Sequence, residues 1–136
     1  ELETGARAVI RETLVLGRHG ERGGRVESSF SARDAGGPVL VEQLALDGVA
    51  PEPGVLGEHR VFDAVIALGF TPDTTPGDLV LEEPGAIARH LGIETHTSRL
   101  DRVWDVWSDV ARQKTAGHVD ERANEVVERN RSDLIA

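Results

Sequence analysis

The sequence of 136 residues is long enough for one domain with a core of its own, and its formal charge of −9 argues against binding to nucleic acid or to an anionic membrane. It contains no cysteine, which excludes disulfides, thiolate metal sites and cysteine nucleophiles and is compatible with a reducing, cytoplasmic setting. No apolar run approaches the roughly 18 residues that a membrane span needs.

The first half of the chain predicts strands separated by glycine-rich loops. The chain opens at Glu1 with no methionine and enters a strand-like segment at once, so we expect further sequence to precede it. Residues 8–16 are rich in Val, Ile and Leu and predict a mostly buried strand. A loop with three glycines and three charged residues follows over 18–24, and the clean alternation of 25–33 predicts a half-exposed strand.

The next segments continue the strand pattern. Residues 34–37 form a hairpin-type turn, and 38–47 predict a third strand that Glu42 interrupts. A loop rich in Pro and Gly follows over 47–57. Residues 59–68 are apolar on both faces of a fourth strand, with Asp63 as the exception.

Helices are expected toward the end of the chain. A short strand is predicted over 79–81, and a short helix over 84–91 because Pro84 stands in its first turn and Gly92 follows its end. The clearest helix is predicted over 98–112, where a capping-box-like start precedes an apolar stripe at helical spacing. The charged residues 114–136 predict a marginal helix or a disordered tail, separate from a β domain over 1–113.

Three short motifs and a closing segment follow one another in an informative order. They are ETLVLGRHGE at 12–21, LVEQLALDG at 40–48, GVLGEHRV at 54–61 and THTSRLDRVWDVW at 95–107. This ordered set resembles the C-terminal portion of the UreD family, also called UreH, of urease accessory proteins. Each motif is weak alone, and the order and spacing of the set carry the resemblance.

The resemblance implies a fold and a function. The fold is mainly β, with layered, helicoidal antiparallel strands and C-terminal helices. The function is that of a scaffold that binds UreF and, through it, UreG, contacts apo-urease, and assists nickel insertion without a reaction of its own. It implies no tightly bound cofactor, and nickel(II) is cargo in transit.

Five residues are candidates for a weak, transient nickel path. Nickel(II) accepts imidazole and carboxylate ligands, and a conduit must bind the ion loosely enough to release it. Glu12, Glu42 and Asp63 interrupt apolar strands, where a carboxylate is costly unless it is paired or bound to a cation. Glu21 and His19 lie in the glycine-rich loop. Salt bridges or solvent exposure are the alternatives for these side chains.

Other conspicuous residues fit structural or partner-binding roles. Arg18 is expected to clamp a carboxylate within the fold or on UreF, and Gly20 to permit a positive φ or a close backbone approach. Asp47 before a glycine fits turn chemistry. Trp104 and Trp107 fit the core better than an exposed partner patch.

Two other classes of function remain open at this level. One is a carboxylate enzyme such as a glycosidase, with Glu12 and Glu42 as an acid and base pair. The other is a small β-rich ligand-binding or structural domain, which predicts one closed apolar pocket. The accessory-protein hypothesis predicts instead exposed strand edges or apolar patches that a partner covers.

Overall fold

The computed structural model describes residues 1–18, 20–21, 23–93 and 99–113 of the chain. Within them lie six strands and one helical segment, over residues 101–113. The strands are β1 (Ala8–Val15), β2 (Arg25–Asp34), β3 (Gly37–Asp47), β4 (Val61–Leu68), β5 (Leu79–Val80) and β6 (Gly85–Gly92). The mainly β prediction is therefore confirmed.

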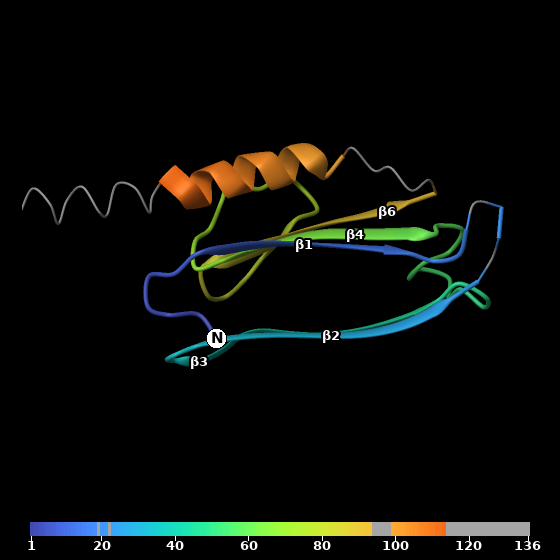
Figure 1. Ribbon diagram of the computed structural model, residues 1–136, viewed down its shortest axis with the longest axis horizontal. Coiled ribbons are helices and arrows are strands. Elements are labelled where there is room, and N and C mark those ends of the chain that lie inside the picture. Colours follow the sequence, from blue (N-terminus) through green and yellow to red (C-terminus); the bar gives the residue numbers. More distant parts are fainter. Residues whose placement is uncertain (19, 22, 94–98, 114–136) are drawn as a thin grey trace, which may run out of the picture.

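The elements form three layers (Figure 1). The middle layer is a four-stranded sheet in the order β1-β4-β6-β5, and every neighbouring pair in it is antiparallel. The hairpin β2–β3 is a separate two-stranded sheet that covers one face, and the helix over 101–113 covers the other. The chain therefore builds a layered antiparallel structure, as the strand pattern predicted.

Strand β4 is the centre of the molecule. It pairs with β1 on one side and β6 on the other, and all its residues are buried. A strand covered on both faces can carry apolar side chains at every position, which explains why 59–68 shows no alternation.

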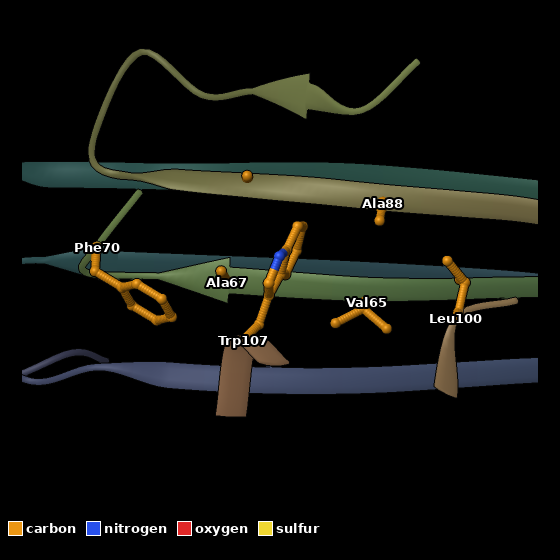
Figure 2. Packing of buried hydrophobic residues seen from close by; sticks show 7 residues of the cluster. Val65, Ala67, Phe70, Ala88, Leu100 and Trp107 are labelled. Atoms are coloured by element: carbon orange, nitrogen blue, oxygen red, sulfur yellow. The ribbon is translucent and has the colours of Figure 1, made fainter. Parts of the chain in front are cut away.

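The core on the helix side is built around Trp107. Figure 2 shows this side chain reaching from the helix toward the sheet, where it lies beside Val65 and Ala67 of β4. Its indole N–H donates to the carbonyl of Asp73 at 3.3 Å, so its polar atom is satisfied. Trp104 is partly buried against the same cluster. The predicted apolar stripe therefore faces the sheet.

Two apolar clusters fill the space between the sheet and the hairpin. The buried residues of one lie toward the start of β2, and those of the other lie toward its end. The first comprises Leu16, Leu46, Leu56, Phe62 and Ala64, and the second Ala32, Ile66, Leu68 and Ile87. The alternating inward positions of β2 and β3 supply part of both clusters.

The helix predicted over 84–91 is wrong, because this segment is strand β6. It pairs with β4 along its whole length, from Gly85 opposite Leu68 to Gly92 opposite Val61. Ala, Leu and Arg are good helix formers, but eight residues are too few to form a helix on propensity alone. Pairing with a central strand outweighs that local preference.

The helix predicted over 98–112 corresponds to the helix of the structure. The structure has helix over 101–113, and the proposed cap Ser98 lies outside the described residues. The tail over 114–136 also lies outside them.

At the hairpin turn, Asp34 accepts a hydrogen bond from the backbone N–H of Gly36 at 2.7 Å, as turn chemistry predicts.

Candidate functional site

Glu12 lies in the middle of β1, on the face of the sheet that the hairpin covers. Its neighbours on that face, Ile10 and Leu14, pack into the two hairpin-side clusters. The hydroxyl of Ser28, which points inward from β2, donates to Glu12 Oε1 at 3.2 Å. The alternation of β1 therefore holds this carboxylate between the two layers.

Glu42 reaches the same space from the other layer. It occupies an inward position of β3 and accepts a hydrogen bond from Arg89 Nη2 of β6 at 2.6 Å. The Arg89 and Glu42 side chains are 41% and 21% exposed, so the pair is partly shielded from water. Ala64 of β4 lies opposite both Glu12 and Arg89, which places these two side chains in one row across the sheet.

We call Glu12, Ser28, Glu42 and Arg89 the interlayer polar belt. Its members Glu12, Ser28 and Glu42 line a cavity of about 10 Å³ together with Ala64 and other apolar side chains, a volume on the order of one water molecule. Two carboxylates and one guanidinium leave a formal charge of −1 at the belt. Apolar clusters on both sides keep bulk water away and strengthen electrostatic interactions there.

The belt has the chemistry of a weak cation site. Carboxylate and hydroxyl oxygens can contact a divalent cation, and Arg89 competes with such a cation for Glu42. In residues 1–18, 20–21, 23–93 and 99–113, no group of three or more His, Asp or Glu is placed to hold a metal ion.

Asp63 lies on the opposite face of the sheet, under the helix. It is fully buried and accepts hydrogen bonds from Arg11 Nε at 3.2 Å, Arg11 Nη2 at 2.8 Å and the Thr13 hydroxyl at 2.8 Å. Arg11 also binds Asp101 of the helix at 2.6 Å. The hydrogen bond to Asp63 is the main reason that the pKa of Arg11 is raised. Arg11 thus links Asp63 of the sheet to Asp101 of the helix, and Asp63 is not brought near Glu12 or Glu42.

The glycine-rich loop is held by an arginine that sequence reasoning missed. Arg60 donates to the backbone carbonyls of Gly17, at 3.0 Å, and of Arg18. The Arg18 side chain is exposed, and no ion pair within the described part of the chain involves it, so its expected clamp on a carboxylate stays a prediction. Gly20 has φ +77° with open space around it, which explains the glycine by backbone conformation.

Two other residues of this loop were candidates for the nickel path. Glu21 is exposed, and His19 lies outside the described residues. Sequence reasoning also missed Ser28 and Arg89. Ser28 carried a usable signal, because it lies on the inward face of a cleanly alternating strand. Arg89 carried none, since its segment was interpreted as a helix.

Asp47 lies where β3 ends and the next loop begins. It accepts a hydrogen bond from Arg25 Nη2 at 2.6 Å and from the backbone N–H groups of Val49 and Ala50 at 2.9 and 3.1 Å. The hydrogen bond from Arg25, followed by those from the backbone, lowers the pKa of Asp47 to about 2. The residue stabilises a turn and an ion pair at the surface.

This lowered pKa predicts a pH-dependent contribution of Asp47 to stability. The folded-state pKa of about 2 lies below the ordinary value of 3.8, so the contribution is present above that value and is lost as pH falls toward the lower one. Asp47→Asn should therefore be less stable than the parent chain near neutral pH, and the difference should shrink between those two pH values. Urea unfolding at a series of pH values measures it; a difference independent of pH would contradict the assignment.

None of the helical residues that the structure describes makes a segment long and apolar enough to cross a membrane.

Comparison with known proteins gives a consistent result. A family model described as "UreD urease accessory protein" matches residues 1–123. The "Urease accessory protein UreD 1" of Streptomyces griseus is 41% identical over 119 residues, which is 81% of this chain and 47% of that protein. The "Urease accessory protein UreD" of Streptomyces avermitilis is 43% identical over 72 residues, or 50% of this chain and 29% of that protein. The chain thus spans about half the length of the first relative, and no solved structure matches it significantly.

Proposed function

The chain belongs to the UreD family of urease accessory proteins, and from this membership we propose that it acts in urease maturation as a scaffold that assists the insertion of nickel(II) into apo-urease. In this proposal the chain catalyses no reaction and binds no cofactor tightly. It works in the cytoplasm beside UreF and, through UreF, beside UreG. Nickel(II) is its cargo.

The observation that supports a passage for nickel is the meeting of Glu12 and Glu42 in the interlayer polar belt. The two residues come from different layers and line one cavity together with Ser28. Nickel(II) accepts carboxylate oxygen, and two carboxylates with one hydroxyl make an incomplete ligand set. An incomplete set releases an ion readily, which is what transfer from one protein to another requires.

The size of the cavity sets a condition on this passage. A volume of about 10 Å³ holds roughly one water and excludes an ion with its full hydration shell. A passing ion must therefore lose water, and Glu42 must exchange its bond to Arg89 for a bond to the ion. Side-chain packing joins the hairpin to the sheet here, so the space would also widen if the two layers moved apart.

The belt does not favour the two competing functions. A sugar ring does not fit between Glu12 and Glu42, because their shared cavity is about the size of one water. A ligand-binding domain calls for a closed apolar pocket. The cavity of about 400 Å³ in the described part of the chain is open, and its lining mixes apolar residues with carboxylates such as Glu83.

The proposal predicts a loss of urease activation when both belt carboxylates are neutralised. In cells lacking the full-length gene, complementation with Glu12→Gln plus Glu42→Gln should lower urease activity and urease-bound nickel several-fold. The reason is that an amide oxygen attracts a divalent cation far less than a carboxylate does. Urease activity and the nickel content of purified urease are measured at equal levels of the accessory protein.

A matched variant separates the belt from overall charge. Glu27→Gln plus Glu52→Gln removes the same charge from two exposed positions and should leave activation unchanged. Full nickel loading by the belt variant rejects the passage through these two glutamates. Capture of UreF by the chain tests the scaffold role separately, because that role does not need the belt.

A further inference from the structure

Among the described residues, strand β5 is the last strand of the four-stranded sheet, and one of its edges has no strand partner there. It pairs with β6 on one side, Leu79 opposite Ile87 and Val80 opposite Ala86. The N–H of Leu81 donates to the carbonyl of Gly85 at 3.1 Å. Backbone groups alternate in direction along an antiparallel strand, so the N–H and C=O of Val80 point away from β6. This edge offers backbone donors and acceptors to another strand.

The side chains of this edge are apolar and half exposed. Leu79 is 51% exposed and Val80 is 53% exposed. Leu79 lies opposite Ile87, which packs on the hairpin side, and Val80 lies opposite Ala86, which packs on the helix side. Each face of the sheet therefore ends in a half-covered apolar side chain, and a strand placed alongside β5 would bury both.

The stretch of sequence that contains β5 is acidic and includes no basic residue. Between Arg60 and Arg89 the sequence has no Lys, Arg or His. The residues over 71–84 include four carboxylates, Asp73, Asp78, Glu82 and Glu83, which give this stretch a formal charge of −4. Three of them are exposed and Asp78 is half-buried. Such a surface attracts a basic segment and repels an acidic one.

We propose that β5 binds an extended segment of a partner protein by strand addition, and that this segment carries Lys or Arg residues among apolar residues. A second copy of this chain fits less well, because pairing β5 with β5 brings Glu82 and Glu83 of both copies together. The proposal goes beyond nickel passage and does not depend on it. It predicts backbone pairing for affinity and charge for selectivity.

A cavity beside β5 extends the acidic surface. It has a volume of about 400 Å³, and Glu83 and Pro84 line it together with Glu3 and Asp34. The lining includes no Lys or Arg within the described residues. A basic side chain at the end of the added strand can enter this cavity and meet carboxylates from three separate segments.

A synthetic peptide tests the proposal on the chain as it stands. The probe is a short, dye-labelled peptide of alternating Lys and Val, titrated against the chain by fluorescence anisotropy at physiological salt. NMR shifts on binding should centre on residues 78–83. The same peptide with N-methyl groups on alternate amides keeps its charge and loses its donors on one edge, so it should bind about tenfold more weakly.

Variants of the chain test the edge and the charge separately. Val80→Pro removes an outward N–H, which an edge strand tolerates, and should weaken binding about tenfold with little change in melting temperature. Glu82→Lys plus Glu83→Lys should also weaken peptide binding about tenfold with little change in melting temperature. Glu52→Lys plus Glu58→Lys changes the net charge equally at exposed positions elsewhere and should leave the affinity within about twofold.

The losses of affinity predicted above would support strand addition, and the results below would overturn it. Equal binding of the N-methylated peptide, or of the plain peptide to Val80→Pro, overturns strand addition. An equal loss in the Glu52 and Glu58 variant shows attraction by net charge alone and also overturns the proposal. The urease assay above does not enter this test, so the two proposals stand or fail independently.

Discussion

Arg11→Met should lower the free energy of unfolding by about 3–5 kcal/mol, the range for breaking a buried ion pair by removing one partner. Arg11 supplies two of the hydrogen bonds to Asp63, which is fully buried under the helix. Methionine keeps much of the volume of the side chain and removes its charge, so the carboxylate of Asp63 loses both hydrogen bonds from Arg11 and the attraction of its guanidinium. Urea unfolding followed by tryptophan fluorescence measures the loss.

Asp101→Asn is the matched control for this network. Asp101 also binds Arg11, at 2.6 Å, but its side chain is 58% exposed. Exposed ion pairs contribute little, so this variant should change the free energy of unfolding by less than about 1 kcal/mol. If the two variants lose equal stability, the buried carboxylate is not the source of the effect, and the assignment of the Arg11–Asp63 pair as the main stabilising contact of this network is wrong.

Gly69→Ala should destabilise the chain by about 2–4 kcal/mol, through backbone strain and a clash with the start of β1. Gly69 has φ +80°, and a Cβ atom there would lie 2.1 Å from the backbone carbonyl oxygen of Ala6. That oxygen belongs to the chain entering β1, so relief requires a shift of the edge strand. Thermal and urea unfolding measure the change.

Gly5→Ala separates the two causes of this loss. Gly5 has φ +78°, nearly the same conformation, but a Cβ atom at that position meets nothing within 4 Å. It should cost about 1 kcal/mol from backbone conformation alone. The difference between the stability losses of Gly69→Ala and Gly5→Ala is the contribution of the clash. A difference near zero would show that β1 shifts without a cost in stability.

The strands of the first half of the chain were predictable because their signals are local. Alternation over 25–33 and the apolar run over 59–68 each reflect which faces of a strand are covered. The strand β6 was not predictable in this way. Gly85–Gly92 is covered on both faces over most of its length, so it has no alternation, and its Pro and Gly flanks suit a helix equally well. Pairing with β4 and β5 decided its structure.

The candidate site was predictable in part. Glu12 and Glu42 stand out in the sequence as carboxylates in apolar strands, and so does Asp63. The partners of these carboxylates were not predictable in the same way. Arg89 pairs with Glu42, and Arg11 pairs with Asp63. Each pair joins residues about fifty positions apart, and no local pattern specifies which arginine meets which carboxylate.

The sequence by itself determined the strand faces, the double-sided burial of β4, the apolar stripe of the helix and the resemblance to the UreD family. These follow from periodicity and motif order, which are properties of neighbouring residues. Only the tertiary structure decided that Glu12 and Glu42 share one side of the sheet while Asp63 lies on the other, and that β5 ends the sheet in an acidic, apolar edge. Strand register and layer order set these positions, because moving a strand by one residue exchanges its two faces.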